Sequence, residues 1–170
     1  IDSIGGQFDA FTTREYTCFY IKALDKYLDT LMELLSDILL NSTFEGEEFV
    51  KEKQVIMEEI KMSKDMPDDY LHNLFYKTFW GNHGLGRPIL GTKKTITGLT
   101  PEFLRKYFKT SYQPQRMIIS VVGNFGEEKL IDLTRKYFIF ENLEGNNIPP
   151  REKPVCKSGY VLKQKKLDFY

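Results

Sequence analysis

The apolar and polar positions at the start of this chain have the periodicity of two β-strands. Residues 7–12, QFDAFT, alternate polar and apolar side chains, and residues 16–24 are rich in aromatic and β-branched residues, as strands commonly are. The segment Thr13-Arg14-Glu15 lies between them and can turn the chain. Because the connection is this short, we expect the two strands to be antiparallel.

The next part of the chain has helical periodicity. Residues 25–40 predict a helix with Asp25 as its N-cap, and its apolar stripe comprises Leu28, Leu31, Leu35, Ile38 and Leu39. Residues 44–66 predict a second helix, preceded by a capping box of Ser42 and Glu45 and ended by Pro67. A third helix begins at Pro67, with an apolar side formed by Leu71, Leu74, Phe75 and Phe79.

The remaining pattern alternates loops, helices and strands. The glycine-rich segment 81–91 lacks the Walker lysine pattern, so a surface loop is a better interpretation than a phosphate-binding loop. Pro101 begins a helix that runs to about residue 108, and residues 127–138 predict another, with Leu130, Ile131, Thr134 and Phe138 facing inward. Residues 115–123 and 159–169 are expected to be strands. This order favours an α+β fold, an antiparallel sheet with helices packed on one face.

The helix predicted over residues 44–66 carries two carboxylates inside its apolar arc. A helix advances about 100° per residue, which groups the apolar side chains Phe49, Val55, Ile56, Ile60 and Met62. Glu52 and Glu59 fall within that arc, and their spacing of seven residues places them about 10 Å apart along the axis. A carboxylate that faces a core needs a cation, hydrogen bonds or a metal ion. A metal or catalytic role is therefore one interpretation, and two ordinary carboxylates at the edge of the stripe are the other.

Composition adds bounds without naming a function. Hydrophobic residues make up 41% and charged residues 28% of the chain, as in ordinary globular proteins. Lys plus Arg and Asp plus Glu are balanced at 24 each, so charge does not indicate a nucleic-acid or membrane partner. No apolar run is long enough to span a bilayer. Cys18 and Cys156 are far apart in the sequence and form no C-x-x-C. We interpret them as reduced thiols of an intracellular, cytoplasmic protein, and a single disulfide between them is the alternative.

Several segments, taken together and in order, resemble the pitrilysin/insulinase family of zinc metallopeptidases. They are IGGQFDAFTTREYTCFY, LLSDILLNSTF, EFVKEKQVIMEEIKM, LGRPILGT and VVGNF, and they extend over nearly the whole chain. The likeness is strongest to bacterial members similar to the β subunit of mitochondrial processing peptidase. The resemblance implies a hydrolase, a metalloendopeptidase that acts on extended peptides.

The resemblance also implies roles for the two carboxylates. In this family an H-x-x-E-H segment supplies two His ligands and a general-base Glu, and a Glu on a later helix completes the Zn²⁺ site. Glu59, in VIMEEI, matches that ligand, and Glu52 matches an acidic residue that orients a His ligand. Zinc with an open position would bind and activate water for peptide hydrolysis.

The first predicted strand would bind substrate in the same family. Its residues Gln7, Phe8, Asp9, Ala10 and Phe11 would pair with the backbone of an extended peptide by strand addition. Asp9 stands where the family commonly has Asn, which puts side-chain contacts to the peptide in doubt. An ordinary edge strand is the alternative.

One departure from the family pattern bears on whether the protein is an enzyme or a non-catalytic homologue. The 170 residues contain no H-x-x-E-H, which in the family lies shortly upstream of the GG-x-x-x-A stretch, so we expect this fragment to be inactive by itself. We expect residues 1–141 to belong to a metallopeptidase domain, residues 142–154 to be a linker, and residues 155–170 to begin the next domain. A second homologous domain or subunit would close over the site. The rival is a non-catalytic homologue that serves as a peptide-binding or structural subunit.

Overall fold

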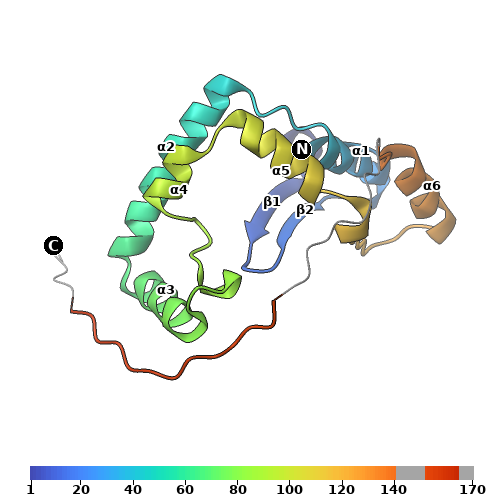
Figure 1. Ribbon diagram of the computed structural model, residues 1–170. Helices are drawn as coiled ribbons and strands as arrows, with labels where there is room; N and C mark the ends of the chain where they lie inside the picture. Colours follow the sequence, from blue (N-terminus) through green and yellow to red (C-terminus); the bar gives the residue numbers. More distant parts are fainter. Residues whose placement is uncertain (141–151, 165–170) are drawn as a thin grey trace. The chain divides into compact units, whose positions relative to one another are not determined.

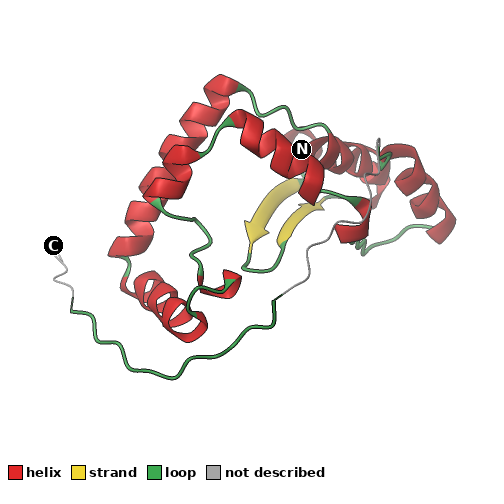
Figure 2. Cartoon of the chain, in the orientation of Figure 1, coloured by secondary structure: helices red, strands yellow, loops and turns green. Residues whose placement is uncertain are grey.

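The computed structural model describes residues 1–140 and 152–164, and it confirms an α+β fold (Figure 1). Among these residues the chain has two β-strands and six α-helices (Figure 2). It divides into two compact units. The first contains residues 1–11, 17–44 and 101–140, and the second contains residues 12–16, 45–100 and 152–164.

The elements of the first unit are two paired strands and three helices. Strands β1 (Gln7–Thr12) and β2 (Thr17–Lys22) form a two-stranded sheet. The helices are α1 (Leu28–Leu40), α5 (Pro101–Ser111) and α6 (Glu127–Tyr137), and short 3-10 turns cover Asp2–Ile4, Asp25–Tyr27 and Pro114–Arg116. The strand pair, the helix over 25–40 and the two later helices agree with the sequence pattern.

The core of the first unit lies between α1 and α6. Leu28 and Met32 of α1 pack on Leu133 of α6, and these three side chains are almost completely buried. Outside this core, Asp29 joins the same helices, because the Tyr137 hydroxyl donates a hydrogen bond of 2.5 Å to its carboxylate. This hydrogen bond is the main reason that the pKa of Asp29 lies below its usual value.

The second unit is built from three consecutive helices and the loop between the last two. They are α2 (Gly46–Asp65), α3 (Pro67–Trp80) and α4 (Lys93–Gly98), with a 3-10 turn at Gly84–Gly86. Pro67 begins α3 directly after α2 ends, as the sequence predicts. Helix α4 was not predicted, and Lys53 of α2 ties it down by donating hydrogen bonds to the carbonyls of Thr97 and Leu99.

Two predicted strands are wrong where the structure describes them. The 3-10 turn Pro114–Arg116 overlaps the start of this segment, and residues 117–123 form neither helix nor strand. Ile118 and Val122 are almost fully exposed at 95% and 96%. An apolar run forms a strand only where a neighbouring backbone completes the ladder, and the sheet in the described part of the chain consists of β1 and β2 alone. Residues 159–164 are likewise irregular, and residues 165–169 lie outside the described part.

Smaller details of the helices also differ. Asp25 does not cap α1; its carboxylate accepts hydrogen bonds from the Lys26 amide and the Asn124 side chain. The capping box at Ser42 does not form, because the Ser42 hydroxyl donates to the carbonyl of Ile38 and α2 begins at Gly46. Some predicted inward positions are exposed on these helices, namely Leu71, Phe75 and Ile131.

Both cysteines, Cys18 and Cys156, are free thiols. Across residues 1–140 and 152–164, every helix is too short or too polar to cross a membrane. The boundaries expected at residues 141 and 154 stay predictions, since residues 141–151 lie outside the described part.

Candidate functional site

Helix α2 buries a narrower face than its periodicity predicts. Phe49 and Ile56 are half-buried and Ile60 is 6% exposed, so these three positions do face the interior. Val55 and Met62 are 50% and 67% exposed. They lie more than about 100° around the helix axis from Phe49, which is too far for them to belong to the buried face of α2.

Glu52 and Glu59 are exposed, so the prediction that they face the core of this chain is wrong. They lie about 60° and 80° from Phe49 around the axis, beside the exposed Val55 and Met62. The two carboxylates therefore share one solvent-facing side of α2 with two apolar side chains. Apolar side chains exposed beside carboxylates are typical of a surface that binds a ligand or another segment of protein.

The acidic residues of α2 differ in their partners. Glu48 forms an ion pair of 2.6 Å with Lys51, and Glu58 forms one of 2.5 Å with Lys61. Among the described residues, Glu52 and Glu59 have neither an ion pair nor a hydrogen bond. Glu58 and Glu59 are adjacent in sequence, but the structure distinguishes their roles. Glu58 forms an ion pair with Lys61, whereas Glu59 is available to a ligand.

The described residues offer one carboxylate that is suited to a metal ion. A carboxylate oxygen is a normal zinc ligand, and the unpaired Glu59 fits that role. A protein zinc site needs three or four ligands, and no group of three or more His, Cys, Asp or Glu side chains gathers in residues 1–140 and 152–164. Glu59 can therefore be one ligand, and the described residues do not complete the set.

Strand β1 is exposed along its whole length, from Gln7 to Thr12. Thr13 donates its amide to the carbonyl of Tyr16, and from this pair the amides of β1 alternate between β2 and the outer edge. Counting back places the Ala10 amide at the outer edge, where the Asp9 carboxylate accepts its hydrogen bond at 2.7 Å. The same carboxylate accepts a hydrogen bond from Tyr20, which raises the pKa of that hydroxyl.

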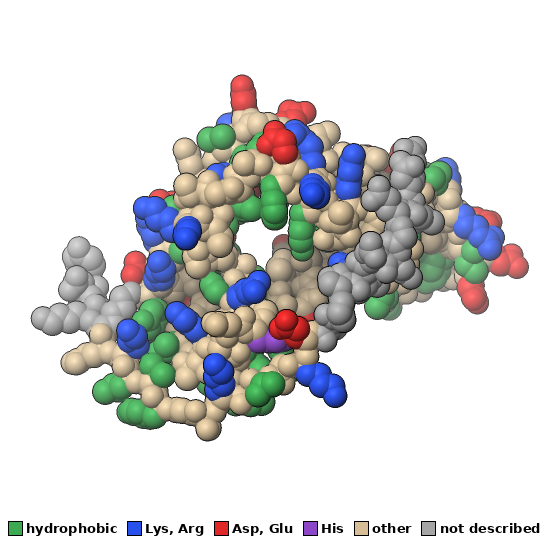
Figure 3. Space-filling view, viewed as in Figure 1, with side chains coloured by type: hydrophobic (Ala, Val, Ile, Leu, Met, Phe, Trp, Pro, Cys, Tyr) green, Lys and Arg blue, Asp and Glu red, His purple; other side chains and the backbone are tan. Residues whose placement is uncertain are grey.

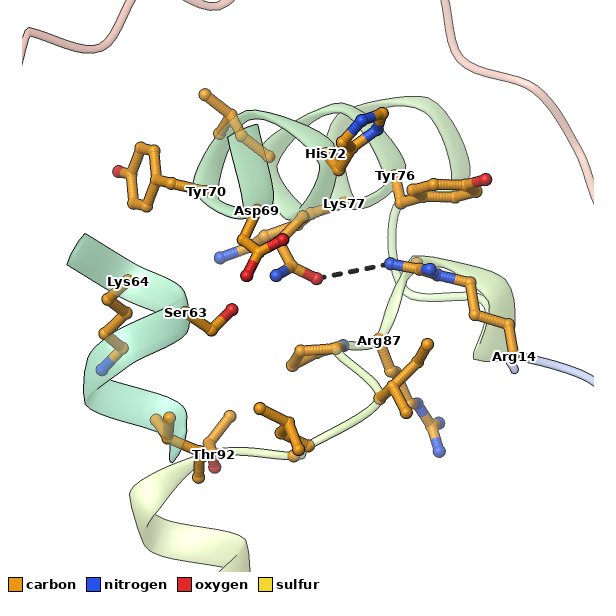
Figure 4. A pocket seen from close by; sticks show the side chains of 18 of the residues that line it. Arg14, Ser63, Lys64, Asp69, Tyr70, His72, Tyr76, Lys77, Arg87 and Thr92 are labelled. Carbon is orange, nitrogen blue, oxygen red and sulfur yellow. Dashed lines mark hydrogen bonds between the residues drawn. The ribbon is translucent and has the colours of Figure 1, made fainter. Parts of the chain in front are cut away.

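The second unit contains a cavity of about 1240 Å³ between α2, α3 and the loop that follows α3. Glu59 and Ile60 line it from α2. His72 and Tyr76 line it from α3, and Figure 4 labels both. Of the residues singled out from the sequence as site residues, this cavity includes Glu59. Glu52 is not among its lining residues, and Gln7 to Phe11 belong to the first unit.

Arg14 is the functional candidate that sequence reasoning missed. It follows β1, and its side chain contacts α3 and the loop near Leu85 at the wall of the cavity. Its partners lie 59 and 71 residues away in the sequence. No local pattern links residues at such distances, and Arg14 in isolation is one polar residue of a turn.

Comparison with models of known protein families shows the family to which this chain belongs. The profile described as "Insulinase (Peptidase family M16)" matches residues 1–93, and the one described as "Peptidase M16 inactive domain" matches residues 98–168. The chain belongs to the insulinase family of peptidases, as its motifs imply.

Named relatives and solved structures agree with this assignment. The chain is 44% identical over 140 residues to the "Uncharacterized zinc protease YmxG" of Bacillus subtilis, covering 82% of this chain and 34% of the relative. It is 34% identical over 153 residues to an uncharacterized zinc protease of Mycobacterium leprae, covering 89% and 34%. A protease crystal structure from Helicobacter pylori superimposes with a TM-score of 0.83 at 27% identity, covering 89% of this chain and 37% of that one. The chain spans about a third of the length of these proteins.

Proposed function

We propose that the protein carrying this chain is a zinc-dependent endopeptidase that hydrolyses extended peptides, with Glu59 as one of its metal ligands. The observation that supports this most is the unpaired carboxylate of Glu59 on an exposed face of α2, at the wall of a cavity. Relatives described as zinc proteases support the choice of metal and reaction. The two His ligands and the general base would come from an H-x-x-E-H segment elsewhere in the complete protein.

The two carboxylates, Glu59 and Glu52, would then have different roles at the metal. When bound, zinc would supply a water of lowered pKa for attack on the peptide carbonyl. Glu59 would hold the metal through its carboxylate, and Glu52, two turns earlier on the same face, would accept a hydrogen bond from a His ligand and fix its orientation. The carboxylate of Glu52 has no partner among the described residues, so it is available for that hydrogen bond.

Strand β1 would bind the substrate backbone. Its exposed residues Gln7 to Phe11 offer an edge to an extended peptide. The Ala10 amide is already engaged by Asp9, so a peptide that pairs with Ala10 must displace that carboxylate. We further propose a cytoplasmic enzyme of the processing-peptidase type, in which a second homologous domain or subunit closes over the site.

The competing function is a non-catalytic homologue that binds peptides or serves as a structural subunit. Residues 98–168 match a domain described as inactive, whereas residues 1–93, which contain Glu52 and Glu59, match the insulinase profile. The sequence upstream of Ile1 in the complete protein separates the two. An H-x-x-E-H segment there supports the enzyme, and a gene without one supports the homologue.

The test of the enzyme is hydrolysis of a fluorogenic extended peptide by the complete protein. Glu59→Gln should reduce kcat/KM at least about a hundredfold, since it removes a metal ligand. Glu58→Gln changes the adjacent carboxylate, which is 66% exposed and paired with Lys61, and should retain activity within about twofold. Wild-type activity in the Glu59→Gln protein contradicts the ligand assignment. Equal loss in both variants indicates a structural effect instead.

A further inference from the structure

We propose that the cavity of the second unit binds a carboxylate group of a peptide through Arg14. This proposal rests on the proposed peptidase function and adds a substrate preference to it. It starts from the position of Arg14, which is half-buried at the cavity wall. A half-buried guanidinium is fully charged at any physiological pH, so its surroundings show what it is suited to bind.

The contacts of Arg14 are all with uncharged groups. Its Nε donates a hydrogen bond of 2.9 Å to the Leu85 carbonyl, and its Nη2 donates one of 3.3 Å to the side-chain oxygen of Asn73. The guanidinium also lies 3.6 Å from the centre of the Tyr76 ring (Figure 4). Among the described residues it has no carboxylate partner, so its positive charge is not neutralised locally.

These contacts also fix the guanidinium in place. The turn that carries Arg14 is closed by the Thr13 hydroxyl, which accepts hydrogen bonds from the amides of Glu15 and Tyr16. With Nε and one Nη2 hydrogen engaged, the planar group keeps Nη1 for another acceptor. A carboxylate is the acceptor that matches a guanidinium in charge and geometry.

The side chains that line the cavity carry an excess of positive charge, which has the same sign as the charge of Arg14. Its lining includes five cationic side chains and two acidic ones among the described residues: Arg14, Lys64, Lys77, Arg87 and Lys163 against Glu59 and Asp69. Several Lys and Arg side chains are visible around α2 and α3 in Figure 3. The excess of positive side chains favours a negatively charged peptide group over a neutral one. A peptide supplies a carboxylate either from an Asp or Glu side chain or from its C-terminus.

The test measures the binding of fluorescein-labelled extended peptides to the complete protein by fluorescence anisotropy, after chelation of its metal to prevent hydrolysis. Two peptides with amidated C-termini differ by one residue, Glu or Gln, and a third is the Gln peptide with a free C-terminal carboxylate. Wild type should bind at least one carboxylate-bearing peptide about tenfold more tightly than the amidated Gln peptide. The peptide that shows the gain identifies the source of the carboxylate.

Variants assign that gain to Arg14. Arg14→Gln should abolish the difference between the peptides, and Arg14→Lys should restore part of it, because it keeps the charge without the planar fork. Arg105→Gln is the matched control: Arg105 also donates to two carbonyls, those of Thr43 and Phe44, and lies on α5 in the first unit. It should keep the wild-type preference.

A second variant protects the test against misfolding of Arg14→Gln. Lys77→Gln changes an exposed cavity residue and should reduce the preference about twofold to threefold, as a nearby charge does. If wild type binds all three peptides equally, or Arg14→Gln keeps the preference, the carboxylate site is wrong and the peptidase proposal is untouched. If no peptide binds, both the carboxylate site and peptide binding by this chain are contradicted.

Discussion

Truncating Met32 should destabilise the first unit measurably. Met32 is 2% exposed and packs with Leu28 and Leu133 between α1 and α6. Replacing a buried Met with Ala costs about 2–5 kcal/mol through lost burial and the cavity left behind. The residues around this cluster are only partly buried and can move inward, so we expect a value in the lower part of the range, about 2–3 kcal/mol.

Hydrogen exchange of the α1 and α6 amides measures this free energy where the change is made. Met62→Ala is the matched control, since it removes the same atoms from a side chain that is 67% exposed and should change stability by less than about 0.5 kcal/mol. Combining Met32→Ala with Leu133→Ala should give a non-additive result, with a coupling of at least about 0.5 kcal/mol, because both belong to one cluster. Equal effects of Met32→Ala and Met62→Ala would refute this assignment of the core.

Two further changes test the second and first units in turn. Gly86→Ala should lower the melting temperature and increase hydrogen exchange in the loop that lines the cavity, because an added Cβ would lie 2.5 Å from the Gly81 carbonyl oxygen. Gly84→Ala is the control and should be nearly neutral, since its added Cβ would have nothing within 4 Å. Equal melting temperatures of the two variants would contradict this packing. The hydrogen bond from Tyr137 lowers the pKa of Asp29, so Asp29 stabilises the fold above its usual pKa of about 4 and loses that contribution as the pH falls through the lowered value. Thermal unfolding from pH 7 to pH 2 should therefore show a shallower acid-side decline for Tyr137→Phe than for wild type, and parallel curves would rule out this role of Tyr137.

The sequence predicts the parts of this fold that repeat locally. The hairpin of β1 and β2 and the long helices follow from alternation and from apolar residues three or four positions apart. Helix α4 covers only Lys93–Gly98, which is too short for periodicity, although Thr92 and Thr95 form a capping box there that could have been searched for.

Features that depend on distant partners were not predictable in this way. The apolar run at 115–123 has the composition of a strand, and pairing decides whether it becomes one. On α2, periodicity places Phe49 and Ile60 correctly, but the width of the buried face depends on what packs against it, so Glu59 was expected inside and is exposed. The contacts of Arg14 with Asn73 and Leu85 depend on the tertiary fold alone.

The zinc content of the purified complete protein tests the central claim most directly. Metal analysis of wild type and the Glu58→Gln variant should find about one zinc per chain, and the Glu59→Gln variant should lose most of it while its circular dichroism is unchanged. A Glu59→Gln protein that keeps its zinc would show that this carboxylate does not hold the metal.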